Sequence, residues 1–369
     1  MGAESLSFND WNHNGHGDEQ PPIILGLQPS ALVDHVARVD WYLLDQMTGE
    51  RGGSIPVGIE ELEYILREAK AYILSFPNDP SPMKTMAGGS VANTIRGLSS
   101  GFKISSGIIG AYGNDDQGRL FIDSMSFNGV NLSRMRKKKG HTAQCVCLVD
   151  ALGNRTMRPC LSNAVKVQAE ELTRENFRGS KWLVVRYAML NLEVIQAAIR
   201  LAKEEGLLVS LDLASFEMVR NFKVQLLTLL ESGKIDLCFA NEDEATELLR
   251  GEQSADPKAA VEFLAKYSQW AVVTLGRNGC IAKHGKEIVQ IPAIGEVNAT
   301  DATGAGDLFA SGFLYGLVMG LSLEQCCMVG SCSGGSVIRS LGGEVTLENW
   351  HWMYKQMQIW GLACPDICK

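Results

Sequence analysis

Acidic and very small residues near the end of the chain have a spacing that could bind an anion. In "NATDATGAGDLFASGFLYG", Asp301 and Asp307 flank Gly304, Ala305 and Gly306, which have little or no side chain. Such a bare backbone lets a bulky anion reach the N–H groups, and the apolar segment that follows predicts a helix whose positive end faces the same point. The alternative interpretation is a buried helix preceded by a tight turn, with Asp307 as its N-cap.

The composition favours a protein that binds small molecules. The chain has 369 residues, of which 46% are hydrophobic, and this suffices for one large α/β domain or two modest ones. Its net charge is −8 and no basic face is evident, which argues against nucleic acid as the main partner. The longest apolar stretch, residues 308–323, contains glycines and is too short to cross a bilayer, so we expect a core helix and no membrane contact.

The cysteines and the N-terminus indicate a cytoplasmic location. The ten cysteines lie mostly within apolar runs and lack paired CxxC motifs, so we expect reduced, buried thiols, with a zinc site at Cys364 and Cys368 as the less favoured alternative. The N-terminus matches neither a secretory signal nor a myristoylation motif. The run "RMRKKKG", residues 134–140, could serve nuclear import or bind phosphate, but a solvated turn before a strand is the favoured interpretation.

The elements that must position the glycine-rich stretch follow from hydrophobic periodicity. Residues 1–20 are polar and predict a disordered leader. Residues 21–369 alternate short apolar strands with amphipathic helices, which predicts a single α/β domain with a doubly wound, mostly parallel sheet. Segments at about 31–55 and 140–162 are predicted to add a small β lid. Ligands of such sheets bind where strands end, and the motifs "GG", "NEDE" and "GAGD" follow strands or begin helices.

Four motifs in the chain resemble the signatures of one known family. The sequence has no GxxxxGK[ST] motif, and Phe309 stands where a dinucleotide fingerprint needs glycine. Instead, "GGSVANTIRGLSS" with "GIIGAYGNDDQGRLFIDSMSFNGV", then "FANEDEATELL", "VVTLGRNGC" and "NATDATGAGDLFASGFLYGL" resemble, in order, the ribokinase family, also called the pfkB carbohydrate kinases. The resemblance spans approximately Pro22 to Leu347, and the agreement of separate motifs makes it specific.

The resemblance implies ATP-dependent transfer of the γ-phosphoryl group to a hydroxymethyl oxygen. Asp307 matches the family's catalytic base, and the N–H groups of Gly304, Ala305 and Gly306 match its anion hole, which receives the charge of the moving phosphoryl group. Asp301 and Thr303 match a loop that binds a monovalent cation, usually K⁺, in many members. The second loop of that cation site is expected within residues 336–343.

Two further pairs of residues are expected on the nucleotide side. Asn241 and Glu244 match the family's residues that hold Mg²⁺ through water, although "NEDEATELL" is also typical of an acidic first turn of a surface helix. Thr274 and Gly276 lie where the family binds adenine and ribose.

The acceptor side is expected to use a second set of residues. Gly88, Gly89 and Asn93 match the family's substrate signature, and Asp34 matches an early acid that binds paired hydroxyl groups. Further polar candidates are Asp212, Arg158 and Asn163.

The acceptor and the assembly are predicted less narrowly than the reaction. "ALVDHVARVD", "GNRTM" and "FANEDEATELL" most resemble the adenosine-kinase-like branch, so we expect a purine ribonucleoside, with a free sugar of the ribose or fructose type as the alternative. A pfkB-like protein that binds ligands or partner proteins without catalysis is an alternative of another class, which the intact base and anion hole disfavour. Either a monomer or a homodimer is compatible with the resemblance.

Overall fold

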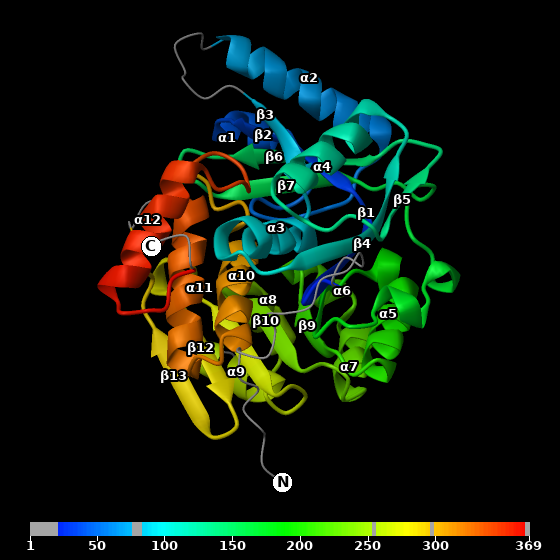
Figure 1. Cartoon of the computed structure of the whole chain (residues 1–369). Helices are drawn as coiled ribbons and strands as arrows, with labels where there is room; N and C mark the ends of the chain where they lie inside the picture. Colours follow the sequence, from blue (N-terminus) through cyan, green and yellow to red (C-terminus); the bar gives the residue numbers. More distant parts are fainter. Residues whose placement is uncertain (1–20, 76–82, 253–255, 296–298, 366–369) are drawn as a thin grey trace.

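The computed structural model describes residues 21–75, 83–252, 256–295 and 299–365, so the predicted leader and Cys368 lie outside it. Within these ranges, the chain forms a nine-stranded sheet with a four-stranded sheet above one of its edges (Figure 1). The large sheet has the order β13-β12-β11-β10-β9-β8-β1-β4-β5, and all pairs are parallel except β11–β12 and β12–β13. Its strands are β1 (Ile24–Ser30), β4 (Ser106–Gly113), β5 (Met135–Lys138), β8 (Trp182–Arg186), β9 (Leu208–Asp212), β10 (Leu237–Asn241), β11 (Trp270–Thr274), β12 (Cys280–His284) and β13 (Glu287–Ile291).

Helices cover both faces of the large sheet because its strands are apolar on both sides. In β1, Ile24 belongs to one buried cluster and Leu25 to the other, as the alternation of side chains along a strand requires. The first face carries α3 (Ser90–Arg96), α4 (Asp116–Phe127), α10 (Ala305–Val318), α11 (Leu323–Val337) and α12 (Leu347–Ile359). The second carries α5 (Leu192–Glu204), α6 (Phe216–Asn221), α7 (Lys223–Glu231), α8 (Glu242–Leu248) and α9 (Pro257–Leu264). This arrangement confirms the predicted doubly wound, mostly parallel α/β class.

The small sheet, called the lid here, has the order β3-β2-β6-β7. Its strands are β2 (Leu32–Arg38), β3 (Lys84–Gly88), β6 (Ala143–Val149) and β7 (Arg155–Cys160). The helices α1 (Trp41–Asp45) and α2 (Ile59–Ser75) pack on its outer face, where Leu62 and Ile65 belong to one buried cluster with Val146 and Leu148. The sequence analysis did not assign β3 to the lid, and residues 39–55 contribute α1 and a loop rather than a strand, apart from an isolated bridge at Ser54.

The basic run at residues 134–140 is not the solvated turn that the sequence favoured. Residues Met135–Lys138 form β5, which pairs with Gly110–Gly113 of β4 at the edge of the large sheet. Lysines are common on edge strands because their charge opposes pairing with another chain. Lys138 forms an ion pair with Glu171 at 2.6 Å, which links β5 to the segment before β8.

Two features of the described residues concern the cysteines and the length of the apolar helices. The cysteines among them, nine in number, are free thiols and seven of these are buried. None of the helices in these ranges combines the length and the apolar character that a bilayer span requires.

Candidate active site

Four parallel strands end at one edge of the large sheet, and each places a polar side chain there. These are Arg186, Asp212, Asn241 and Thr274, the last residues of β8, β9, β10 and β11. Parallel pairing puts Arg186 opposite Asp212 and Asn241 opposite Thr274. The four side chains, the start of α10 and the inner face of the lid line one cavity of about 240 Å³. Because doubly wound sheets bind ligands at such an edge, this cavity is the candidate active site.

The start of α10 offers backbone N–H groups to this cavity. Gly304 precedes the helix with a φ of +78°, a conformation that favours glycine. Among the described residues, no acceptor takes the N–H groups of Gly304, Gly306 or Asp307, whereas Ala305 uses its N–H within the preceding turn. The N–H groups that remain for an anion therefore include that of Asp307 and not that of Ala305, in contrast to the predicted set.

Asp307 lies in the first turn of α10 and accepts a hydrogen bond from a residue of α3. The side-chain amide of Asn93 donates to its carboxylate over 2.9 Å. Burial raises the pKa of Asp307 above its ordinary value, and the hydrogen bond from Asn93 is the largest influence in the opposite direction. The positive charges of Arg186 and Arg155 also lower it. The carboxylate is thus kept close to neighbours that favour its ionised form.

Asp34 occupies the lid side of the same cavity. It is 2% exposed, and its Oδ1 has no hydrogen-bond partner among the described residues. Burial raises the pKa of Asp34 to about 7, although the charge of Arg96 acts against this. A buried acceptor atom without a partner is costly unless a ligand satisfies it, and a substrate hydroxyl would do so.

The two adjacent glycines of the "GGSVAN" motif have different roles. A Cβ at Gly88 would lie 2.1 Å from the carboxylate of Asp34, so a bare residue is needed to admit that carboxylate. Gly89 has a φ of +95° and lines the cavity, whereas Gly88 does not. The structure therefore places Gly88 beside Asp34 rather than against the expected acceptor.

Asn241 and Glu244 form a reciprocal cap at the start of α8. The Asn241 side chain accepts from the N–H of Glu244 over 2.8 Å, and Glu244 accepts from the backbone and side-chain amides of Asn241. Both residues also line the cavity, so the capping role is compatible with the predicted Mg²⁺ role. Burial and the nearby charge of Asp212 raise the pKa of Glu244 to about 8. A divalent cation fits this place because it would relieve the repulsion between these carboxylates.

Asp301 connects the glycine-rich loop to the second predicted loop. It is fully buried, and its two carboxylate oxygens accept from the N–H groups of Thr303 and Gly342, each over 2.8 Å. Gly342 lies within residues 336–343, where the second loop was expected. The Oγ1 of Thr303 is buried without a partner in the part of the chain that the structure describes, and such an oxygen is suited to bind a cation.

The remaining candidates divide between the cavity and its surroundings. Thr274 lines the cavity, whereas Gly276 lies in the turn after β11 and outside the lining. Asn163 lines a neighbouring cavity of about 130 Å³. Arg158 is wrong as a polar lining residue because it is 1% exposed and donates to the backbone carbonyl of Met157.

Sequence reasoning missed two arginines that do line the cavity, Arg155 and Arg186. Arg155 is the first residue of β7, directly after the turn of Asp150–Asn154. Along β7 the lining residues are Arg155, Met157 and Pro159, whose spacing of two puts them on one face. The "GNRTM" turn was the available signal for Arg155. Arg186 is held by the hydroxyl of Ser90 over 2.6 Å and lies 3.6 Å from Asp212.

Comparisons with known proteins agree with this geometry. The model of the pfkB family carbohydrate kinases matches residues 66–350. The fold is similar to that of a probable sugar kinase from Rhizobium etli, with a TM-score of 0.81 and 25% identity over 94% of this chain and 100% of that one. It is also similar to adenosine kinase from Sinorhizobium meliloti, with a TM-score of 0.80 and 26% identity over 90% and 99%. A 5-dehydro-2-deoxygluconokinase from Geobacillus thermodenitrificans is 22% identical over 69% of this chain and 78% of its own length.

The fold, the cavity and these likenesses define a phosphotransferase that uses an alcohol group as acceptor. The chain belongs to the pfkB family of carbohydrate kinases, in which both sugar and nucleoside kinases occur. Membership implies the use of ATP, typically together with Mg²⁺.

Proposed function

We propose that this protein transfers the γ-phosphoryl group of ATP to the 5′-hydroxyl of a purine ribonucleoside. One observation carries the proposal: the same cavity is lined by Asp307 and the start of α10, by Asp34, and by exposed apolar side chains such as Leu161 and Leu190, called the rim here. An acceptor that binds Asp34 through paired hydroxyls would extend its hydroxymethyl group toward Asp307. The rim then determines which acceptor is bound best.

The rim of the cavity is apolar and comes from the lid and from the segment after β8. Leu161 is 38% exposed and Leu190 is 57% exposed, so both present apolar surface to solvent when no ligand is present. A purine base would cover this surface, whereas a free sugar has no flat apolar group to do so. Apolar lining residues from the lid, from the loop that bridges to it and from the segment after β8 include Leu32, Pro56, Met157, Pro159, Leu161, Met189 and Leu190.

In the proposed reaction, the ionised carboxylate of Asp307 accepts the proton of the attacking hydroxyl. The amide of Asn93 orients that carboxylate through its 2.9 Å hydrogen bond. The N–H groups at the start of α10 receive the charge that develops on the phosphoryl group, and the guanidinium of Arg155 adds to this from the lid. These roles use groups that already face one cavity.

Cations would support the phosphate end of the cavity. Glu244 and Asn241 would hold Mg²⁺ through water, and the ion would neutralise phosphate charge. Asp301 and Thr303 would belong to the K⁺ site, together with residues 336–343. Thr274 and the turn at Gly276 would lie beside the nucleoside part of ATP.

A free sugar or sugar acid is the second candidate acceptor. Two guanidinium groups, those of Arg155 and Arg186, line the cavity, and such groups bind carboxylates well. Arg186 is, however, already engaged with Asp212 and Ser90, which leaves less capacity for an acidic sugar.

The test is ATP consumption across a panel of acceptors, with the product identified by phosphorus NMR. The panel contains adenosine, inosine, guanosine, uridine, ribose, fructose and 5-dehydro-2-deoxygluconate. We expect the highest kcat/KM with a purine ribonucleoside and a 5′-monophosphate as product. Preference for a sugar would overturn the assignment of the acceptor. No consumption with any acceptor, together with ligand-induced thermal shifts, would instead support a binding protein without catalysis.

A further inference from the structure

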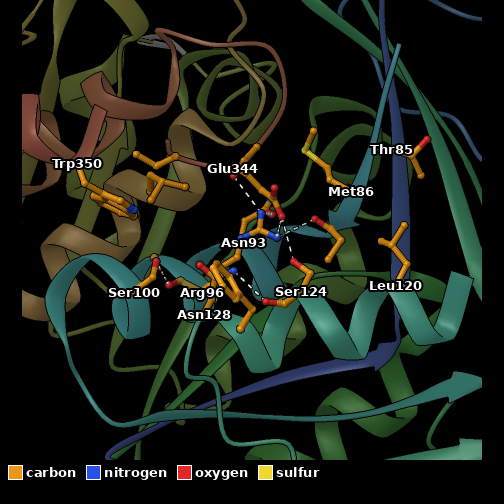
Figure 2. A pocket seen from close by; sticks show the side chains of 16 residues that line it. Thr85, Met86, Asn93, Arg96, Ser100, Leu120, Ser124, Asn128, Glu344 and Trp350 are labelled. Atoms are coloured by element: carbon orange, nitrogen blue, oxygen red, sulfur yellow. Dashed lines mark hydrogen bonds and ion pairs between the residues drawn. The ribbon is translucent and has the colours of Figure 1, made fainter. Parts of the chain in front are cut away.

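A buried arginine behind the active-site cavity joins three segments of the chain. Arg96 ends α3 and is 4% exposed. Its guanidinium donates to the carbonyls of Ala87 at 2.9 Å and Gly343 at 3.1 Å. It also donates to the side chains of Asn93 at 2.7 Å and Glu344 at 3.0 Å (Figure 2). β3, α3 and the segment before α12 are therefore held by one side chain.

The contact with Asn93 determines which end of that amide faces Asp307. The Oδ1 of Asn93 accepts from Arg96, so its Nδ2 must point the other way, and it donates to Asp307. An amide has one accepting and one donating end of nearly the same shape. Without Arg96, the amide could turn over and present its oxygen to the carboxylate, which would repel it.

Arg96 also connects the acceptor side to the predicted cation loop. The carbonyl of Gly343 accepts from Arg96, and the neighbouring N–H of Gly342 donates to Asp301. A Cβ at Gly343 would lie 3.0 Å from the amide of Asn93, so the two groups are closely packed. A displacement of Arg96 would therefore disturb both Asn93 and the loop that contains Gly342 and Gly343.

The charge of Arg96 is shared among carboxylates from different elements. Asp34 from β2 and Asp307 from α10 face it from the cavity, and Glu344 pairs with it from outside. Glu344 also accepts from the hydroxyl of Ser124 on α4 over 3.0 Å. A second cavity, of about 360 Å³, lies on this outer side and is lined by Arg96, Glu344 and Trp350 (Figure 2). Arg96 thus lines the outer cavity, Asn93 lines both, and the charge of Arg96 acts on two acids of the inner one.

We propose that Arg96 is a positioning residue for phosphoryl transfer, which fixes the amide of Asn93 so that it donates to Asp307 and places a positive charge near Asp34 and Asp307. The proposal rests on the proposed kinase function. It concerns a group that touches no reacting atom and acts through Asn93 and through its charge.

The experiment compares Arg96→Met, Arg96→Lys and Glu344→Gln with the unaltered protein. For Arg96→Met, we expect kcat to fall by about 10- to 100-fold, as a misplaced catalytic group typically causes. The acidic limb of the kcat/KM profile should move up by roughly one pH unit because the carboxylates lose a cation. Arg96→Lys should keep the acidic limb close to its original pH, since the charge remains. Its kcat should stay reduced, because an ammonium group cannot reproduce the several hydrogen bonds of the planar guanidinium.

Glu344→Gln is the matched control because glutamine keeps an acceptor for Arg96 and removes only the outer charge. We expect kcat within about threefold of the unaltered protein, since an ion pair with a half-exposed partner contributes little. Calorimetric ATP affinity and thermal unfolding distinguish a local effect from misfolding. The proposal is overturned if folded Arg96→Met retains both kcat and the pH limb, or if Glu344→Gln lowers kcat as much as Arg96→Met does.

A second readout separates this inference from the proposed function. Aspartate labelled with ¹³C at the carboxyl carbon reports the titration of Asp34 and Asp307 without substrate, with Asp34→Asn and Asp307→Asn used for assignment. Arg96→Met should raise both titration midpoints even if no acceptor is phosphorylated. Unchanged midpoints would refute the inference about Arg96, whereas changed midpoints in a protein without kinase activity would refute only the proposed function.

Discussion

Four carboxyl groups line the active-site cavity, those of Asp34, Asp212, Glu244 and Asp307. Burial raises the pKa of each, and the charges of neighbouring acids add to this effect at Asp34, Asp212 and Glu244. Arg96 acts in the opposite direction on Asp34, and Arg155 and Arg186 act in the opposite direction on the other three. Without ligands the cavity therefore holds acids that are poorly compensated, which is common where function rather than stability determines the residues.

At the residue scale, Asp34→Asn tests whether burial raises the pKa of Asp34. The folded-state pKa of Asp34 is about 7, above its ordinary 3.8, so between these values the folded protein binds more protons than the unfolded chain. The free energy of unfolding must then fall as the pH rises through this window. At pH 8 we expect Asp34→Asn to exceed the unaltered protein by roughly 2–4 kcal/mol in free energy of unfolding, with no difference below about pH 4.

Urea unfolding at a series of pH values measures this difference. Equal pH dependence in both proteins would contradict the raised pKa that burial gives Asp34. The same variant should lose affinity for the acceptor, because an amide does not replace a carboxylate that accepts from two hydroxyls.

At the scale of single elements, α10 combines a left-handed glycine before its first turn with a face open to the cavity. Gly304 has a φ of +78°, and a Cβ there would lie 3.2 Å from the Cα of Gly343. A Cβ at Gly306 would meet no atom within 4 Å, yet Gly306 lines the cavity. The two glycines of "GAG" therefore have different roles. Gly304 allows the left-handed backbone conformation before the helix, and Gly306 leaves space for a ligand in the cavity.

Substitution of each glycine by alanine separates these purposes. Gly304→Ala should lower the free energy of unfolding by about 1–2 kcal/mol because alanine is strained in the left-handed conformation. Gly306→Ala should leave stability unchanged or raise it by up to about 1 kcal/mol, since alanine favours a helix. Both should weaken ATP binding, measured by calorimetry. Normal ATP affinity in Gly306→Ala would argue against phosphate at the start of α10.

At the scale of the whole molecule, the active-site cavity lies between the lid and the edge of the large sheet. Lid residues such as Met157 and Leu161 are separated in the chain from Asn241 and Thr274, yet they line the same cavity. The acceptor is proposed to lie under the lid and ATP along the ends of β10 and β11. The two ligands should therefore affect different segments.

Hydrogen exchange followed by mass spectrometry tests this division. Adenosine alone should slow exchange in residues 155–161 and 187–191, since it would cover the rim. ATP with Mg²⁺ should slow exchange in residues 241–249, 274–279 and 302–307. Protection of the same segments by both ligands would contradict the proposed arrangement.

Local patterns predicted the fold class because parallel strands that are buried on both faces have a distinctive composition. They did not predict that Lys84–Gly88 joins the lid, since the pairing of β3 with β2 is a contact between distant segments. They indicated Arg158 as a candidate and did not single out Arg155. The two residues are three positions apart on β7 and so face opposite sides, and sequence alone does not tell which side meets the cavity. The orientation of the Asn93 amide likewise depends on Arg96, a contact between side chains.

The central claim is that Asp307 accepts the proton of the acceptor hydroxyl, and Asp307→Asn tests it most directly. Asparagine keeps the shape of the side chain but removes its basic oxygen. We expect turnover of the preferred acceptor to fall by about 10²- to 10⁴-fold, the usual contribution of a general base. Calorimetric affinities for ATP and for the acceptor should remain within a few-fold of those of the unaltered protein. Near-normal turnover in this variant would contradict the mechanism.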